Sequence, residues 1–88
     1  MSRIAISIES VELDGSRDYS PLVRRLSSHD AIPVGRMQWI LQTSLTVEQI
    51  RHDIQNYIDP ADRLLVTQVA SMSSRNLINA DKIGRGAA

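Results

Sequence analysis

The chain has 88 residues, 42% of them hydrophobic, and its ten basic residues balance its ten acidic ones. This length allows one domain with a modest core, and the balanced charge excludes a strongly basic nucleic-acid binder. The absence of cysteine excludes disulfides and thiolate metal sites. Since neither a membrane-length apolar run nor a signal-peptide pattern is present, we expect a cytoplasmic protein without a membrane partner.

The first predicted element is a strand in the stretch RIAISIES. Ile4, Ile6 and Ile8 alternate with small or polar residues, which indicates a strand with one apolar face that helices are expected to cover. The following VELDGSRD has the composition of a turn. Three carboxylates close this stretch: Glu9, Glu12 and Asp14.

A short helix is expected next, in DYSPLVRRLSSHD, because Ser20 can cap it and Pro21 suits its first turn. Two extended segments follow, at residues 32–34 and 37–43. Pro33 predicts that the first of them lies at a sheet edge, where a missing N–H is harmless.

The sequence LTVEQIRHDIQNYI predicts a second helix. Thr46 and Gln49 have the spacing of a capping box, and apolar residues then recur every three or four positions. The run RLLVTQVA, residues 63–70, predicts a last strand. Tyr19 and Tyr57, near the helix ends, are expected to pack with solvated hydroxyls.

The predicted order of strand, helix, strand, strand, helix, strand is that of a ferredoxin-like α+β domain. We expect an antiparallel four-stranded βαββαβ sheet with both helices on one face, over residues 1–70. Residues 71–88 form a C-terminal extension, which Leu77, Ile78 and Ile83 are expected to dock in part. Its last residues, 84–88, are expected to be disordered.

The other face of this sheet is expected to be open and to pair with a second copy of the chain. The last strand has apolar residues at both alternating positions, which favours a homodimer. Trp39 could instead stack on a base, but a single aromatic residue favours packing in the core or the dimer interface. The residues predicted to line the interface are Ala5, Ser7, Trp39, Leu64 and Val66.

The stretches GSRDYSPL, RMQWILQT and TSLTVEQIRHDIQNYIDPADRLLVTQV resemble the small SinR-like and VapD-like proteins over about residues 3–70. Those proteins are related to the ferredoxin-fold small subunit of the CRISPR adaptation complex, which is dimeric and in some members a metal-dependent nuclease. In that family an aspartate ending the first strand meets its twin near the dimer axis and holds a divalent ion. The matching residue here is Glu9, after Ile8.

Glu9 therefore has two interpretations. The resemblance implies a catalytic carboxylate that binds Mg²⁺ or Mn²⁺ together with its twin, although the extra methylene of glutamate displaces the carboxylate. The other interpretation is a polar residue at the strand end, paired with an arginine. Glu12 and Asp14 could add ligands or belong to an ordinary acidic loop.

The basic residues have two interpretations as well. Four arginines could line an edge that binds the phosphates of RNA or DNA, or could belong to a solvated charged surface. His29 and His52 lack a second ligand at metal spacing and are expected to be exposed helix residues. The four arginines are Arg17, Arg24, Arg25 and Arg36.

Two functional hypotheses follow. The first is a homodimeric interaction module, similar to the CRISPR adaptation subunit, that serves without catalysis as a scaffold for nucleic acid or another protein. The second is a divalent-metal-dependent endonuclease that uses Glu9 from both protomers. The hypotheses differ in whether the carboxylate at the end of the first strand performs chemistry.

Overall fold

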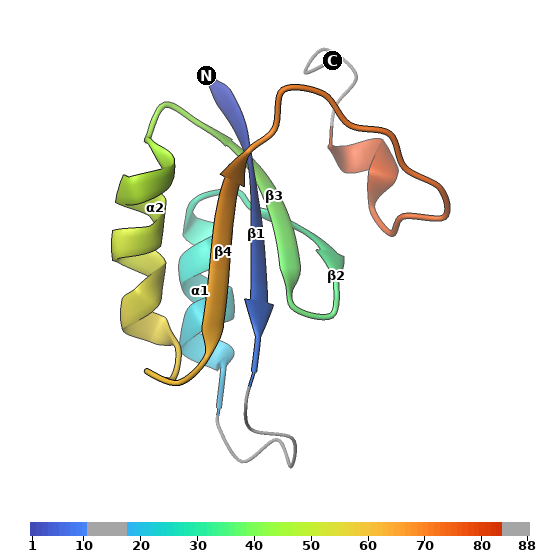
Figure 1. The fold of residues 1–88 in the computed structure, drawn as a ribbon. Helices are drawn as coiled ribbons and strands as arrows, with labels where there is room; N and C mark the ends of the chain where they lie inside the picture. The colour runs from blue at the N-terminus through green and yellow to red at the C-terminus, as the bar shows by residue number, and fades with distance from the viewer. Residues whose placement is uncertain (11–17, 84–88) are drawn as a thin grey trace.

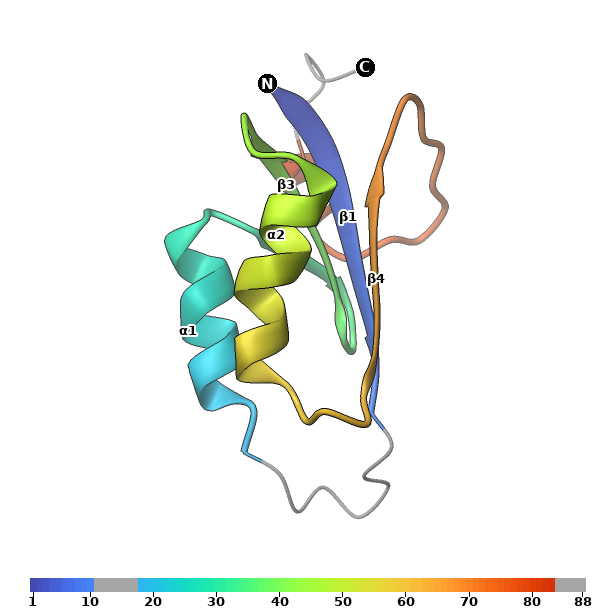
Figure 2. The ribbon, with the colours of Figure 1, turned by 60° about the vertical axis from the view of Figure 1, so that its left-hand side comes forward.

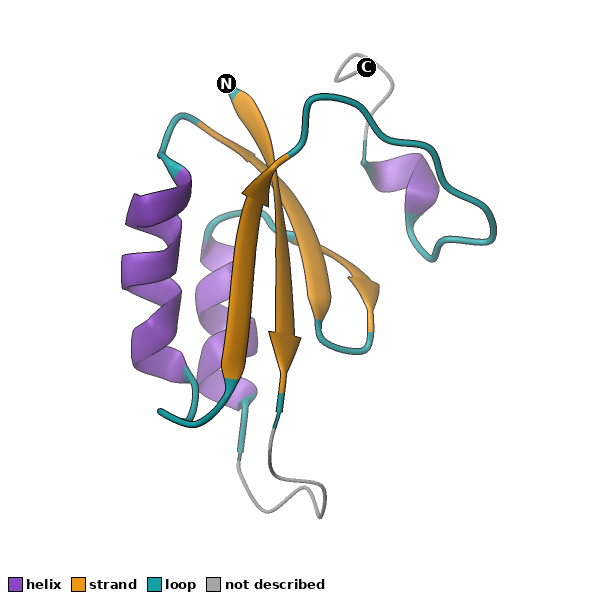
Figure 3. Cartoon of the chain, viewed as in Figure 1, coloured by secondary structure: helices purple, strands orange, loops and turns teal. Residues whose placement is uncertain are grey.

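The computed structural model describes residues 1–10 and 18–83, and it shows an α+β protein (Figures 1 and 3). The strands are β1 (Ser2–Glu9), β2 (Ile32–Gly35), β3 (Gln38–Thr43) and β4 (Arg63–Gln68), and the helices are α1 (Ser20–Ser28) and α2 (Val47–Ile54). Short 3-10 turns lie at η1 (Gln55–Tyr57) and η2 (Ala80–Lys82). The α+β class is confirmed, whereas the predicted disorder of residues 84–88 lies outside the described residues.

The four strands form one antiparallel sheet in the order β2-β3-β1-β4. Both helices pack on the same side of this sheet (Figure 2). Strand β2 lies at one edge, as Pro33 predicted. The arrangement is compatible with a ferredoxin-like fold. None of the helices in the described segments has the length and apolar character that crossing a bilayer requires.

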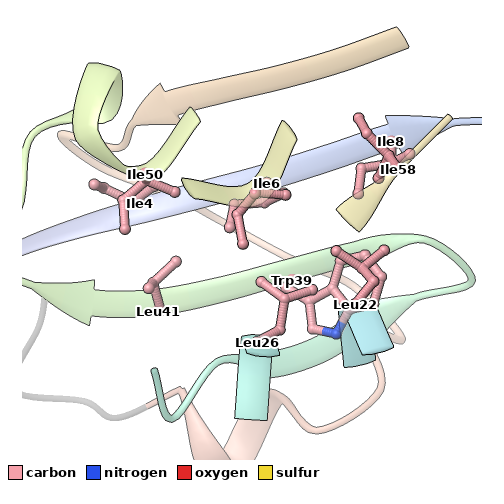
Figure 4. Close-up of a cluster of buried hydrophobic side chains, with 10 residues drawn as sticks. Ile4, Ile6, Ile8, Leu22, Leu26, Trp39, Leu41, Ile50 and Ile58 are labelled. Carbon is pink, nitrogen blue, oxygen red and sulfur yellow. The ribbon is translucent and has the colours of Figure 1, made fainter. Parts of the chain in front are cut away.

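The larger hydrophobic cluster, here called the main core, fills the space between the sheet and the two helices (Figure 4). The alternation of β1 directs its three isoleucines to this side, and each helix contributes one apolar face. The buried members of the main core are Ile4, Ile6, Ile8, Leu22, Leu26, Trp39, Leu41, Ile50, Ile54 and Ile58.

The strand register decides which face of the sheet each side chain uses. Directly opposite residues of an antiparallel pair share a face, and both Trp39 and Val66 lie opposite Ile6, while Leu64 lies opposite Ile8. The predicted interface residues Trp39, Leu64 and Val66 lie instead on the helix-covered side, where Trp39 is buried in the main core, the other position predicted for it. Because β4 is apolar at both alternating positions, its sequence pattern does not identify the inner face.

The two helices begin differently. Helix α2 has the predicted capping box: the Gln49 N–H donates to the Thr46 hydroxyl at 3.1 Å, and the Thr46 N–H donates to the Gln49 side chain at 2.9 Å. In α1, Ser20 is the first helical residue, and its N–H donates to the Asp18 carboxylate at 2.9 Å. The prediction of Ser20 as the cap is therefore wrong, because Asp18 supplies the acceptor from two residues earlier.

Residues 71–83, here called the tail, lie across the sheet from the helices, over its β2–β3 half (Figure 2). The Asn79 side chain donates to the Pro33 carbonyl of edge strand β2 at 2.8 Å. Apolar side chains of the tail and the sheet form a second, smaller cluster, here called the tail cluster. Its buried members are Val34, Ile40 and Ile83, against which Ala5, Ile32, Met72 and Leu77 pack.

Candidate functional site

Glu9 is the last residue of β1 and lies opposite Arg63, the first residue of β4. The Arg63 guanidinium donates a hydrogen bond to the Glu9 carboxylate, and the two groups form an ion pair. The side chains are 65% exposed for Glu9 and 74% for Arg63. An exposed pair of this kind contributes about 1 kcal/mol or less to stability. The carboxylate is thus accessible, but its charge is already balanced by an arginine of the same chain.

The other acidic residues near this strand cannot be added to the site. Glu12 and Asp14, which the sequence analysis considered as further ligands, lie outside the described residues, and so does Arg17. Within residues 1–10 and 18–83, the structure brings together no group of three or more histidine, aspartate or glutamate side chains that could hold a metal ion. Glu9 is the carboxylate that the resemblance assigns to the metal, and among the described residues it belongs to no group of three or more possible ligands.

A second charged cluster joins the two helices. The Asp53 carboxylate of α2 lies 2.8 Å from Nε of Arg25 on α1 and 2.9 Å from Nε2 of His29. Because an ionised carboxylate only accepts hydrogen bonds, this contact requires the proton of a neutral His29 ring to be on Nε2. The side chain of His29 is 18% exposed. The prediction of an exposed His29 is therefore wrong, whereas His52 is exposed as expected.

The electrostatics of this cluster favour the charged forms of Asp53 and Arg25. The hydrogen bond from Arg25 is the main cause that lowers the pKa of Asp53, and the hydrogen bond from His29 acts in the same direction against the effect of burial. The same contact with Asp53 raises the pKa of the Arg25 guanidinium. The cluster therefore acts as a clamp between α1 and α2.

The arginines that were predicted to bind phosphate differ in their accessibility. Arg25 is occupied by Asp53, while Arg24 is exposed on α1 and Arg36 is exposed in the turn between β2 and β3. The two exposed arginines belong to different elements of the fold. The structure thus leaves Arg24 and Arg36 accessible for a phosphate contact and engages Arg25 in the packing of the helices.

Tyr19 and Asp62 form a link that the sequence analysis missed. The Tyr19 hydroxyl donates to the Asp62 carboxylate at 2.6 Å and lies 3.0 Å from the Ser10 hydroxyl. Tyr19 and Tyr57 pack against the main core as predicted, but the Tyr19 hydroxyl bonds to protein side chains rather than to solvent alone. The predicted order of elements contained the signal, because it places the start of the first helix and the start of the last strand at the same end of the sheet.

The uncovered part of the open face lies on β1 and β4, beside the part that the tail covers (Figure 1). Ala5 and Ser7 occupy this face of β1 as expected, and Ala5 packs against the tail cluster. On β4, Leu65 lies opposite Ser7 and is 60% exposed. We call the uncovered part the open strip, and it consists of Ser7, Glu9, Arg63, Leu65 and Thr67.

Comparison with known proteins gives no matching family model, no matching curated protein and no matching solved structure. The resemblance to the SinR-like and VapD-like proteins therefore stays a prediction. A function for this chain has to be argued from its geometry, and the open strip and Glu9 are the features that bear on the two hypotheses.

Proposed function

We propose that the protein is a non-catalytic interaction module of ferredoxin-like βαββαβ topology that forms a homodimer through the open face of its sheet. The observation that carries the proposal is Leu65. This side chain is 60% exposed on edge strand β4, beside the small Ser7 of β1. A single exposed leucine is common on monomers, so Leu65 supports the proposal through its position: it lies on an edge strand, on the same sheet face as the apolar residues Ile32, Val34 and Ile40.

The charges of the open strip favour a second copy of this chain as the partner. In a two-fold symmetric interface the same surface is used twice, so each charge on one protomer can meet its opposite on the other. Glu9 and Arg63 supply one charge of each sign at the end of the strip. A second copy can therefore present its arginine to Glu9 and its glutamate to Arg63 without leaving a charge unmatched.

The proposal agrees with the resemblance found in the sequence, which implies a dimeric scaffold that binds nucleic acid or a protein. A phosphate contact would use the exposed Arg24 and Arg36, since Arg25 is held by Asp53. A nucleic-acid interaction of this kind would be local, because the chain as a whole has no net charge. It would weaken with added salt, because contacts between arginine and phosphate release counterions.

The proposal is tested by sedimentation velocity over a range of protein concentrations. The wild-type chain should associate to a dimer, and Leu65→Arg should shift it to the monomer, because two added charges would face each other across the axis. Val23→Arg is the matched control, since Val23 is 48% exposed but belongs to α1 on the other side of the sheet. Equal association of the wild type and Leu65→Arg would contradict the proposed interface.

The second candidate, a divalent-metal-dependent endonuclease, has the accessibility of Glu9 in its favour. Its carboxylate is 65% exposed on the face that we assign to the dimer, so two copies could approach each other. A metal ion would have to compete with Arg63 for the same oxygens. The ion pair leads us to favour the scaffold, and the experiment on Glu9 described below separates the two functions.

A further inference from the structure

The register of the sheet joins the open strip to the surface beneath the tail. Ala5 of β1 lies opposite Thr67 of β4 on one side and opposite Ile40 of β3 on the other, and Ile40 lies opposite Ile32 of β2. One row of side chains thus crosses all four strands. Thr67 is exposed, whereas Ile40 is buried in the tail cluster. The surface that the tail covers is therefore a direct continuation of the open strip.

The tail is attached in a way that allows it to separate from the sheet. The tail cluster shares no buried member with the main core, and Ile83 is the buried residue of the described tail. Ile78, which the sequence predicts to dock as well, is 56% exposed instead. A unit with so few buried side chains can open without unfolding the remainder.

The dimensions of the open strip explain why a larger surface is needed. Two strands are about 10 Å wide and a six-residue strand is about 20 Å long, so the strip covers roughly 200 Å². A standard interface buries about 800 Å² on each partner. Adding the two strands beneath the tail doubles this area to roughly 400 Å², about half of what each partner of a standard interface buries, and it adds apolar side chains where the strip offers mainly Leu65.

We infer that the surface beneath the tail is the second half of the dimer interface, occupied by the tail in the single chain and by a second copy of this chain when the tail lifts. The inference rests on the proposed homodimer and deepens it, since it makes the tail an internal competitor of the partner. Continuity with the open strip identifies the second copy as the occupant. The side chains that change partner are Ala5, Ile32, Val34 and Ile40.

Competition of this kind has a measurable size. When only a fraction of the chains is open, the apparent dissociation constant is raised by the inverse of that fraction for each copy that must open. A tail that is open in about one chain in ten would thus weaken association about tenfold per copy. Releasing the tail should therefore tighten the dimer by about tenfold or more.

The test compares two substitutions in the full chain. Ile83→Asp places a charge in the tail cluster and should release the tail, whereas Ile78→Asp adds the same charge at an exposed site of the tail. Sedimentation equilibrium should show that Ile83→Asp lowers the dissociation constant of the dimer by at least about tenfold, whereas Ile78→Asp leaves it unchanged. Unchanged emission of Trp39, a buried residue of the main core, verifies that the domain remains folded.

A closed-tail variant supplies the opposite test. The chain has no cysteine, so Pro33→Cys and Ala80→Cys can be joined within one chain by a short bis-maleimide. Ala80 follows Asn79, whose side chain bonds to the Pro33 carbonyl. The joined chain should associate no more tightly than the wild type. A folded Ile83→Asp chain that associates equally or more weakly than the wild type, or that forms open-ended aggregates in place of a dimer, would overturn the inference.

Combining Ile83→Asp with Leu65→Arg separates this inference from the proposed function. One outcome is that Leu65→Arg changes assembly neither in the wild type nor in Ile83→Asp, while Ile83→Asp still tightens the dimer. In that case the open strip is not part of the interface, and the proposed role of the tail stands. If Leu65→Arg weakens assembly but Ile83→Asp does not tighten it, the open strip stands and the role of the tail is wrong.

Discussion

The two faces of the sheet differ in how many side chains they bury and in what covers them. On the helix side, ten buried side chains form the main core, nine from β1, β3 and the two helices and one, Ile58, from the segment after η1, and several of them have no exposed surface. On the tail side, the tail cluster has three buried members, Val34 and Ile40 of the sheet and Ile83 of the tail, and the other described residues of the tail are exposed or half-buried. The same strands serve both faces, because β1 alternates isoleucine with alanine, serine and other polar residues.

This difference shows how one small sheet can use one face to stabilise the fold and leave the other face for binding a partner. The side that must hold the fold together carries large aliphatic residues that two helices cover completely. The side that we propose for the partner carries the small residues Ala5 and Ser7 on β1, and its cover, the tail, buries only Ile83 among the tail's own described residues. Substitutions on the two faces should therefore lower the free energy of unfolding by different amounts. They should also differ in how many segments of the chain they destabilise.

The largest effect is expected on the helix side. Ile6→Ala removes a side chain that is 1% exposed in the main core, and it should lower the free energy of unfolding by about 2–5 kcal/mol, as large-to-small core substitutions do. Ser7→Ala, on the same strand but on the other face, is the control and should change stability by less than about 0.5 kcal/mol. Urea denaturation followed by Trp39 emission measures both values. Comparable losses in the two variants would remove the distinction between the faces.

A smaller and local effect is expected on the tail side. Ile83→Ala should lower the free energy of global unfolding by about 1 kcal/mol or less, because the tail opens before the domain unfolds. Amide hydrogen exchange should accelerate in the tail and β2 and stay unchanged in α2. Ile78→Ala, at an exposed position of the tail, should alter neither. Acceleration throughout the main core in Ile83→Ala would show that the tail is an integral part of the domain.

The clamp between the helices predicts a pH dependence. A carboxyl group whose pKa is lowered by folding, as that of Asp53 is by Arg25, stabilises the fold above its unfolded value near 3.9, and this contribution is lost as the pH falls through the lower, folded value. Asp53→Asn should thus cost about 1 kcal/mol at neutral pH, and the difference from the wild type should shrink below about pH 4.

The matched control for Asp53 is Asp81→Asn, which removes the same charge from the exposed tail. Urea titrations at several pH values between about 3 and 7 would give the free energy of unfolding of all three chains. A cost of Asp53→Asn that does not shrink in acid would mean that Asp53 stabilises the helices by packing rather than through its charge.

Much of the fold could be predicted because the signals that define it are local. The alternation in β1, the Thr46 capping box and the edge proline are each contained in a few consecutive residues, and the structure confirms them. The face used by β4 could not be predicted, because Leu64, Leu65 and Val66 are all apolar. Only its register with β1 decides which of them is buried.

The candidate site was less predictable for the same reason. The sequence position of Glu9 predicts that it ends a strand. Its ion pair with Arg63 could not be predicted, because the two residues are 54 positions apart and meet only through the register of β1 with β4. His29 was assigned to the surface because its partner, Asp53, lies on another helix. Side-chain contacts between distant elements require the packing of the whole domain, which periodicity and spacing do not describe.

The smallest effect on stability, and the most informative for function, is expected at Glu9. Glu9→Ala and Arg63→Ala should each change the free energy of unfolding by about 1 kcal/mol or less, and less at high salt, because both side chains are exposed. A scaffold should leave labelled RNA and DNA intact with Mg²⁺ or Mn²⁺, whether Glu9 is present or not. Cleavage that EDTA and Glu9→Ala both abolish would instead establish the endonuclease. Arg63→Ala then discriminates further, because it frees the carboxylate: an endonuclease should bind its metal ion more tightly without the competing guanidinium, whereas a scaffold should only lose a charge at its interface.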